Sequence, residues 1–410
     1  MKRLFYTFLL AVVGLCPCVQ AQAQKQVLFA THEHDTIPYR IPAIAQTHNG
    51  NLLFMTDWRP CGSDIGYGRV DQRYRVSADG GRTWGRELTL VEGSGRMGAA
   101  DCGFGDPALV ADRKSGEVLL LTVCGSTVYG HKTTTRQNPN RIALFRSLDN
   151  GLTWHPWQEI TEQIYSLFDA SAHGPVQSMF IGSGKIAQSR KVKVGKYYRI
   201  YAAACARPNG NRVIYSDDFG RSWHALGGKD ALPCKEGDEP KCEELPDGSV
   251  VLSSRAMGGR YFNIYRYTNV RSGEGSWQEA AFSGKEVDGV TAVENSCNGE
   301  LLIVKAREAH TGRKVNLALQ SVPLGPRRSN VGIYCKVLRE EDCTSPASLA
   351  SHWEKPFLVS PLGSAYSTMV QLKDGSIAFA YEEATYNAAY SEVFRRLTIA
   401  QITNGKYNSK

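Results

Sequence analysis

Short apolar runs recur along the whole chain, and the spacing typical of amphipathic helices is scarce. Many of these runs follow a glycine turn, and Asn-Gly or Asp-Gly between apolar runs is a strong short-range signal for a β-hairpin. The turns that lead directly into an apolar run are Asn49-Gly50, Ser115-Gly116, Val194-Gly195, Asp247-Gly248, Asn298-Gly299 and Asp374-Gly375. The pattern predicts six hairpins in a chain that is almost entirely β-strand.

A second pattern, S-x-D-x-G-x-T-W, occurs at Ser77–Trp84, at Ser147–Trp154 and, with Ser in place of Thr, at Ser216–Trp223. Its Asp and Ser side chains can bond the amides of a turn, its Gly accepts a positive φ, and its Trp can fold back as an apolar plug. A degraded fourth copy ends at Gly275-Ser276-Trp277. Three copies at nearly equal spacing indicate a repeated supersecondary unit.

We call the three copies of the second pattern boxes. Taken together, the hairpins and the boxes predict one four-stranded sheet for each stretch of chain between successive hairpins. Sheets of this kind repeated around an axis form a β-propeller, in which one set of loops surrounds a central depression. We therefore predict an all-β fold, a six-bladed β-propeller of four-stranded antiparallel sheets that occupies residues 24–410. The terminal run 396–403 is expected to pair with residues 26–30 and close the ring.

Residues 1–23 differ in composition from the rest of the chain. Lys2 and Arg3 precede an apolar run, and small residues follow near Ala21 and Ala23, which is typical of a secretory signal peptide. We expect export, to the periplasm or the medium. No later apolar run approaches the ~20 residues of a membrane helix.

The charge balance is mildly basic, with 48 Lys and Arg against 40 Asp and Glu and a formal net charge of +8. This balance fits an acidic substrate, but it fits a solvated lysine-rich surface equally well. The densest basic stretch, 189–199, alternates Lys with Val and is typical of a protected edge strand, so no nucleic-acid partner is expected.

Cysteine and histidine usage gives no sign of a metal or cofactor. Two of the eleven cysteines lie in the expected signal peptide, and no C-x-x-C occurs. In an exported chain the local pairs Cys335 with Cys343 and Cys234 with Cys242 are candidates for disulfides. His32 and His34 form an H-x-H pair without an evident third ligand.

The motif Tyr39–Pro42, YRIP, becomes informative beside the three boxes. From about residue 27 to 403 the chain resembles the sialidases (neuraminidases), which are secreted six-bladed propellers with an N-terminal Arg-Ile-Pro motif and repeated Asp boxes. The resemblance implies exo-α-sialidase activity on sialylated glycans, namely glycoproteins, gangliosides and oligosaccharides, without a cofactor. It also leads us to expect a monomer.

The substrate that this resemblance implies carries a carboxylate on its anomeric carbon, and the planar fork of Arg suits a carboxylate. In the family three arginines bind this group. By resemblance they are Arg40, Arg255 and Arg328. Arg327 stays open as an alternative to Arg328, which is favoured because Asn330 completes an R-x-N pattern, and Arg313 is a weaker candidate.

The resemblance also implies a tyrosine nucleophile, Tyr366, with Glu239 as its base. A neutral phenol avoids the repulsion that a carboxylate nucleophile would meet at an anionic substrate, and its ordinary pKa near 10 calls for a neighbouring base. Glu243 and Glu244 are close in sequence to Glu239, but they begin a strand and are expected to be solvated or structural.

The expected acid/base residue is Asp64, 24 residues after Arg40, and Asp57 and Asp71 are the alternatives. By resemblance, Arg59 and Asp106 contact the 4-hydroxyl of the sugar ring, and Glu382 orients Arg40. Two other functions remain open: a trans-sialidase, whose intermediate is captured by a sugar or by the substrate's own hydroxyl, and a propeller lectin that binds sialoglycans without cleaving them. Linkage preference depends on rim loops that the sequence does not define.

Overall fold

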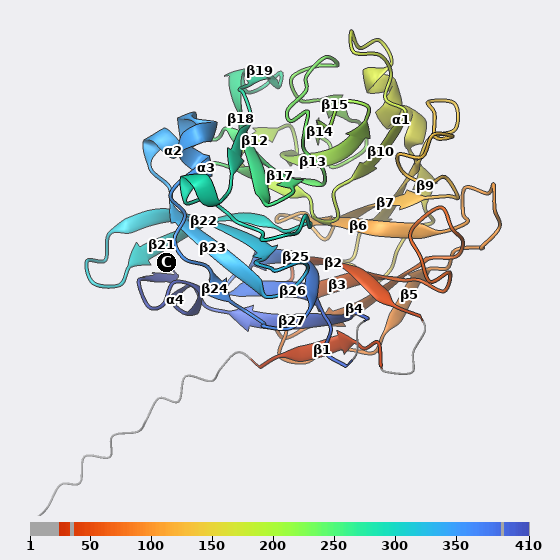
Figure 1. The fold of residues 1–410 in the computed structure, drawn as a ribbon. Helices are drawn as coiled ribbons and strands as arrows, with labels where there is room; N and C mark the ends of the chain where they lie inside the picture. Colours follow the sequence, from red (N-terminus) through yellow and green to blue (C-terminus); the bar gives the residue numbers. More distant parts are fainter. Residues whose placement is uncertain (1–23, 33–36, 387–388, 410) are drawn as a thin grey trace, which may run out of the picture.

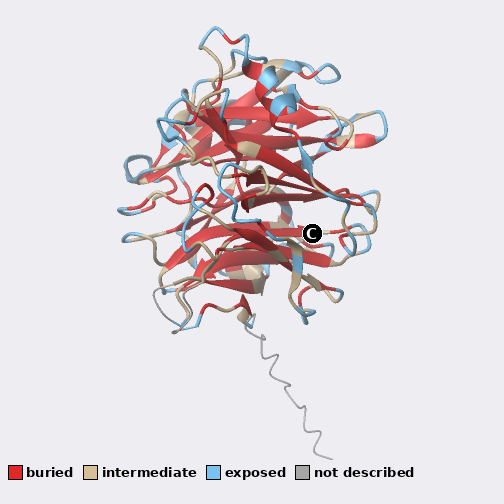
Figure 2. Cartoon of the chain, turned by 90° about the vertical axis from the view of Figure 1, so that its right-hand side faces the viewer, coloured by how far each residue is buried: buried red, intermediate tan, exposed pale blue. Residues whose placement is uncertain are grey.

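The computed structural model describes residues 24–32, 37–386 and 389–409, so the expected signal peptide lies outside the described residues. Six β-sheets are arranged around an axis as a six-bladed propeller, which confirms the predicted fold (Figure 1). Their inner strands contact one another near the middle of the molecule. Buried residues fill the stacked sheets and exposed residues gather in the loops (Figure 2).

The blades follow one another along the chain. The first sheet contains β2 (Tyr39–Gln46), β3 (Leu52–Trp58), β4 (Asp71–Ser77) and β5 (Leu88–Val91). The second contains β6 (Phe104–Ala111), β7 (Val118–Cys124), β8 (Arg141–Ser147), β9 (Gln158–Glu159) and the parallel β11 (Gly184–Lys185). The third contains β10 (Ser178–Ile181), β12 (Ala187–Val194), β13 (Tyr197–Arg207), β14 (Asn211–Ser216) and β15 (His224–Ala225).

The second half of the chain continues this pattern. The fourth sheet contains β16 (Pro240–Glu244), β17 (Val250–Ala256), β18 (Gly259–Asn269), β19 (Glu274–Trp277) and β20 (Ala281–Ser283). The fifth contains β21 (Leu301–Glu308), β22 (Lys314–Pro323), β23 (Val331–Val337), β24 (Phe357–Leu358) and β28 (Tyr407–Ser409). The sixth contains β25 (Ser364–Gln371), β26 (Ile377–Glu383), β27 (Ser391–Leu397) and β1 (Gln26–Phe29).

The helices are short and lie in connections between strands. They are α1 (Thr161–Tyr165), α2 (Glu340–Thr344), α3 (Pro346–Ala350), α4 (Ile399–Ile402) and the 3₁₀ helices η1 (Ser166–Phe168) and η2 (Lys285–Val287). Among the described residues, none of the helices combines the length and the apolarity that a bilayer crossing requires.

Ring closure differs from the expected pairing. β1 supplies the outer strand of the sixth sheet, but its partner is β27, with Gln26 opposite Phe394, and not the run 396–403. The end of that run forms α4, capped by the Thr398 side chain, which accepts a hydrogen bond from the Gln401 amide. A capping residue followed by a short apolar segment favours a helical turn over a strand.

The hairpin predicted at Asn298-Gly299 is also wrong. These residues precede β21, and the inner hairpin of the fifth blade instead joins β21 to β22 through residues 309–313. Asn298 is buried and donates its side-chain amide to the Ser183 hydroxyl at 3.0 Å. The Asn-Gly pair therefore serves a buried contact near the axis instead of a surface turn. The other five turns lie between the expected antiparallel strands.

The three boxes share one hydrogen-bond pattern between the third and fourth strands of their blades. In the first, the Asp79 carboxylate accepts from the amide and the hydroxyl of Thr83, at 2.9 and 2.6 Å, while the Ser77 hydroxyl accepts from the Gly81 amide at 2.8 Å. The same contacts recur around Asp149 and Asp218.

Each box also packs against the preceding blade. A Cβ atom on Gly81 would lie 2.5 Å from the ring of Phe394 in the sixth blade, and one on Gly151 would lie 2.4 Å from Leu53 in the first. Both glycines have positive φ. Glycine is required there by the positive φ of the backbone and by the close approach of the preceding blade. The boxes therefore pack neighbouring blades together.

The first box gives a stability prediction. The Thr83 hydroxyl and amide hold the pKa of Asp79 well below its ordinary value. A carboxylate with a depressed folded-state pKa contributes stability above its unfolded pKa of about 3.9 and loses it as the pH falls. We expect Asp79→Asn to lower the melting temperature at pH 7 and the difference from wild type to shrink near pH 3, as circular dichroism can measure.

The exposed carboxylate of Glu286, outside the boxes, supplies the matched control. Glu286→Gln is expected to leave the melting temperature unchanged at both pH values. A melting temperature of Asp79→Asn equal to that of wild type at pH 7 would contradict the role given to the box.

Candidate active site

One end of the propeller axis is hollowed into a cavity of ≈360 Å³, a size typical of small-molecule sites. Its charged and tyrosine side chains come from several blades: Arg40, Arg59, Asp64, Asp106, Asp238, Glu239, Arg255, Arg328, Tyr67, Tyr129 and Tyr366. The structure thus brings together eight of the nine residues singled out from the sequence. The ninth, Glu382, is buried behind Arg40.

β-bulges in three inner strands position three of these side chains. The pairing register shifts around Ile41 in β2, around Asp106 in β6 and around Tyr366 in β25. Ile41 and Asp106 have φ values of 65° and 54°. A bulge re-aims the side chains beside it, and strained non-glycine residues persist where the surrounding structure fixes them. These bulges lie at the strand ends that face the cavity.

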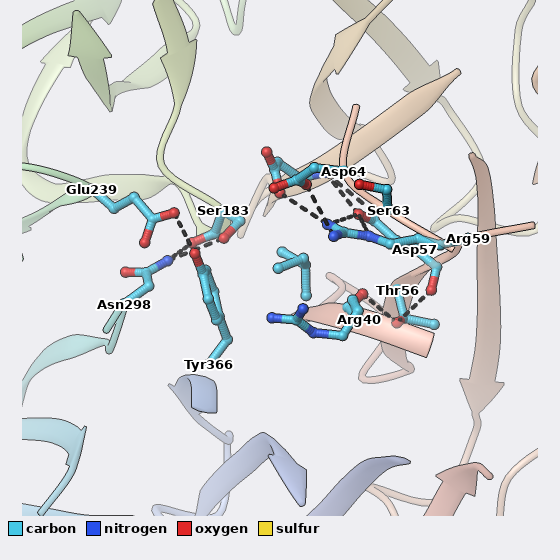
Figure 3. A network of polar contacts seen from close by, with 12 residues as sticks. Arg40, Thr56, Asp57, Arg59, Ser63, Asp64, Ser183, Glu239, Asn298 and Tyr366 are labelled. Carbon is cyan, nitrogen blue, oxygen red and sulfur yellow. Dashed lines mark hydrogen bonds and ion pairs between the residues drawn. The ribbon is translucent and has the colours of Figure 1, made fainter. Parts of the chain in front are cut away.

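The Tyr366 hydroxyl donates to the Glu239 carboxylate at 2.5 Å (Figure 3). Arg255 contacts both groups, with distances of 2.9 Å to Glu239 and 3.2 Å to the Tyr366 oxygen. Burial, followed by the charge of Glu239, raises the pKa of Tyr366 well above its ordinary value, and Arg255 opposes this rise. The phenol is therefore neutral at rest, with a proton acceptor in contact and a cation beside the oxygen.

Arg40 is held by a buried carboxylate. Its Nε donates to Glu382 at 2.7 Å, and the same carboxylate accepts the Ile41 amide at 2.7 Å and the Tyr366 amide at 3.0 Å. Burial alone would lower the pKa of Arg40, but the charge and the hydrogen bond of Glu382, together with the nearby Tyr366, outweigh burial and keep the pKa above its ordinary value. Arg40 is therefore a fixed cation at the cavity.

Arg328 also lies beside the Tyr366 ring. Its guanidinium carbon and that of Arg40 are each 5.7 Å from the centroid of Tyr366. The Arg328 carbonyl accepts the Ser364 amide at 2.9 Å, which places the residue next to β25. Three guanidinium groups, those of Arg40, Arg255 and Arg328, thus surround the tyrosine, an arrangement suited to an anionic ligand.

A second charged cluster lies across the cavity, centred on Arg59. Arg59 donates to the buried Asp57 at 2.9 Å, pairs with Asp64 at 2.9 Å and lies 3.7 Å from Asp106. Burial and the charges of Asp64 and Asp57 raise the pKa of Asp106 well above its ordinary value. Asp64 is the exposed member of the cluster, with 66% side-chain exposure. It is therefore the carboxylate best placed to meet a ligand group at the mouth.

The positions of the alternative site residues in the structure distinguish those that line the cavity from those that do not. Arg327 does not line the cavity, and Arg313 pairs with Glu308 at the turn between β21 and β22. Asp71 is buried and pairs with Arg69 and Arg73. Glu243 and Glu244 are buried structural residues: Glu243 pairs with Lys185, and Glu244 accepts the Arg190 amide.

Several lining residues were not identified from the sequence. One wall is apolar and contains Ile65, Val123, Val128 and Phe180. Asp238 lines the cavity and accepts a hydrogen bond from the Cys205 thiol at 2.8 Å. Only Asp238 had a sequence signal, its place directly before Glu239. The wall residues come from two loops, which contain Ile65 and Val128, and from the strands β7 and β10, and they acquire a common location only through the fold.

The nine cysteines of the described residues are all unpaired, and eight are buried. Neither of the two local disulfide candidates is formed. Cys335 and Cys343 belong to different apolar clusters, and Cys234 and Cys242 pack as apolar residues in one cluster. In the part of the chain that the structure describes, no group of three His, Cys, Asp or Glu residues could hold a metal ion. His34 of the H-x-H pair lies outside that part.

A sequence profile described as a BNR repeat-like domain matches residues 52–379, most of the chain. The chain belongs to this family. One relative of this chain, the sialidase of Micromonospora viridifaciens, is 29% identical over 361 residues, which cover 85% of this chain and 50% of the relative. The sialidase of Bacteroides fragilis is 24% identical, with coverage of 68% and 49%. The resemblance to the sialidases is confirmed, and the chain spans about half the length of these relatives.

Solved structures agree on the fold of this BNR repeat-like protein. A Hadza microbial sialidase superposes with a TM-score of 0.69 at 21% identity and covers 89% of this chain and 66% of its own. The intramolecular trans-sialidase of Ruminococcus gnavus gives a TM-score of 0.65 at 16% identity, with coverage of 92% and 98%. At these identities the likeness shows the propeller fold alone.

Proposed function

We propose that the protein is an exo-α-sialidase, a retaining glycoside hydrolase that releases terminal sialic acid from glycoproteins, gangliosides and oligosaccharides. One observation carries the proposal: the Tyr366 hydroxyl is hydrogen-bonded to Glu239 at 2.5 Å in the same cavity as three arginines. The sialidase relatives support it. A neutral nucleophile beside a base, facing a cluster of cations, matches the needs of an anionic ketoside.

In the first step Arg40, Arg255 and Arg328 bind the sugar carboxylate. Glu239 accepts the phenolic proton while the Tyr366 oxygen forms a bond to the anomeric carbon. The bond from this carbon to the leaving oxygen breaks, and Asp64 donates a proton to that oxygen. Arg255, 3.2 Å from the phenol oxygen, stabilises the negative charge that develops there during attack.

In the second step water replaces the leaving glycan. Asp64, now a carboxylate, accepts a proton from the water as its oxygen attacks the anomeric carbon. The bond to the Tyr366 oxygen breaks, and Glu239 returns the proton to the phenolate. Two displacements at one carbon give retention of configuration. Arg59 and Asp106 are assigned to the 4-hydroxyl.

Product analysis tests the proposal. The purified protein is incubated with 3′-sialyllactose, and the products are separated by chromatography and followed by proton NMR. We expect free sialic acid, released first as the α-anomer. An anhydro-sugar or a new sialoside as the main product would favour the trans-sialidase alternative, and unchanged substrate would favour a lectin. The catalytic trio of Tyr366, Glu239 and Asp64 argues against a lectin.

The role of Asp64 gives a separate prediction. A general acid matters most when the leaving group is a poor one. We expect Asp64→Asn to slow the release of lactose from 3′-sialyllactose by about 10²-fold and the release of nitrophenol from an aryl sialoside by less than about tenfold. Steady-state rates on both substrates measure the difference.

Glu92→Gln is the matched control, because Glu92 is another exposed carboxylate paired with an arginine, Arg69, outside the cavity. Its rates on both substrates should equal those of wild type. Equal loss on both substrates in Asp64→Asn would argue for a binding role and against proton transfer.

Export belongs to the proposal as well, but it is supported by the sequence of residues 1–23 alone. An exported, monomeric enzyme in the periplasm or the medium is the form that we propose.

A further inference from the structure

A second cavity, of ≈440 Å³, lies at the opposite end of the propeller axis. Its lining includes the final residues of β2, β6 and β25, which begin at the candidate active site with Arg40, Asp106 and Tyr366. Six residues of β-strand span about 20 Å. The two cavities therefore open at opposite faces of the molecule.

A buried polar plug separates them. Glu239 directly precedes β16, and Lys241 and Glu243 lie on that strand. Glu239 lines the active-site cavity, and Glu243 lines the second cavity. Between them, Lys241 is 1% exposed and lies 3.4 Å from Glu300, which is fully buried. The Thr368 hydroxyl donates to the same carboxylate at 2.8 Å. Changes at the far cavity can thus be made without touching the catalytic residues.

Four cations at the far cavity lack a carboxylate partner. They are Arg113, Lys114, Arg190 and Lys373, and none of them forms an ion pair with any described residue. Main-chain carbonyls position three of them instead. Arg113 donates to the Gln188 carbonyl at 2.9 Å, Arg190 donates to the Ile303 carbonyl at 3.0 Å, and Lys373 donates to the His48 carbonyl.

These contacts also link the cations to one another across blades. The His48 ring lies 2.8 Å from the Arg113 carbonyl, so the loop that holds Lys373 and the loop that holds Arg113 meet at one residue. The Arg113 guanidinium reaches the main chain of residues 188 and 189, directly before Arg190. Burial and the nearby charge of Arg190 lower the pKa of Arg113.

Three carboxylates lie at or beside the far cavity, and only one of them is paired with a cation. Glu243 neutralises Lys185, Asp112 accepts the Gln188 side-chain amide at 2.8 Å, and Glu244 accepts the Arg190 amide at 2.7 Å and the Ser189 hydroxyl. Carbonyl dipoles orient a guanidinium without cancelling its charge. Five lining cations, Lys185 included, face the three carboxylates of Asp112, Glu243 and Glu244, so positive charge exceeds negative charge by two at the far cavity.

We propose that this far cavity is a second ligand site, which binds a multiply charged oxyanion: a phosphate or sulfate group, free or as the ester of a small molecule. Guanidinium forks match such groups geometrically. The inner surface of the cavity is apolar, with Ile44, Ile186 and Leu302 among its lining. That surface suits the body of an ester beneath a charged head.

Isothermal titration calorimetry at low ionic strength tests the site with three probes: inorganic phosphate, inorganic sulfate and glucose 6-phosphate. We expect one saturable site per chain. Tighter binding of glucose 6-phosphate than of inorganic phosphate identifies an ester ligand, and equal binding identifies the free oxyanion. In the double variant Arg113→Gln/Arg190→Gln the affinity should fall about tenfold or more, while hydrolysis of an aryl sialoside stays at the wild-type rate.

The control removes the same charge elsewhere. Arg271→Gln/Arg339→Gln changes two exposed arginines outside the cavity and should bind the probes as wild type does. If the double variant at the cavity misfolds, Lys373→Gln alone is expected to weaken binding. Absence of saturable binding by all three probes, or equal weakening in the cavity and control variants, would overturn the proposal.

Discussion

Replacement of Tyr366 by Phe is expected to reduce the turnover of an aryl sialoside by about 10³-fold or more, because it removes the atom that attacks the anomeric carbon. The ring itself stays, and so do the flanking Arg40 and Arg328. Binding of the sugar carboxylate should survive. We therefore expect the loss in kcat, with a sialic-acid analogue still binding by calorimetry.

Tyr390→Phe is the matched control. Tyr390 also lies beside Arg40, with 5.3 Å between the guanidinium carbon and the ring centroid, but it does not line the cavity. The same chemical change there should leave kcat within about twofold of wild type. Wild-type turnover by Tyr366→Phe would refute the nucleophile assignment, and comparable losses in both variants would point to an indirect structural effect.

The second large effect is expected from Glu382→Gln. Glu382 is fully buried and accepts hydrogen bonds from Arg40 and from the amides of Ile41 and Tyr366. Removal of its charge leaves Arg40 without a partner and turns an amide NH₂ toward donors that need an acceptor. Breaking one partner of a buried charged pair costs about 3–5 kcal/mol. We expect kcat/KM to fall by about 10²- to 10³-fold.

Glu392 offers a control on the neighbouring strand, directly opposite Glu382 in the β26–β27 ladder. Burial and the charge of Glu382 raise the pKa of Glu392 well above its ordinary value, which favours the protonated form. Glu392→Gln keeps the shape of the protonated carboxyl group, and we expect it to leave kcat/KM nearly unchanged. Equal losses in the two variants would mean that the shape of this buried region matters and the charge of Glu382 does not.

The contact between nucleophile and base shows what could be predicted from the sequence and what could not. Tyr366 and Glu239 are 127 residues apart, and their assignment from the sequence rested on resemblance. The structure places their side chains in contact because β25 and the start of β16 both point toward the axis. Nothing in the local sequence of either strand encodes that contact, since it depends on the closure of the whole ring.

Local signals misled where burial competed with turn propensity. Asn298-Gly299 has the composition of a hairpin turn, but its side chain is used inside the protein at Ser183. Likewise, residues 396–403 alternate as a strand would, yet the capping residue Thr398 begins a helix and β1 pairs earlier along the chain. In the first case a tertiary contact outweighed the local preference for a turn, and in the second a local helix cap outweighed the strand pattern.

By itself, the sequence determined the class of fold through its apolar strands, and the repeat through box turns whose hydrogen bonds are local. It also determined which reactive groups are present, namely a set of arginines, carboxylates and one tyrosine in a recognisable order. The tertiary structure decided which of these side chains share a cavity. The bulges at Ile41, Asp106 and Tyr366, the choice of Arg328 over Arg327 and the exposure of Asp64 over Asp57 all depend on register and on contacts between blades. Such contacts join residues far apart in the chain, so no local pattern can specify them.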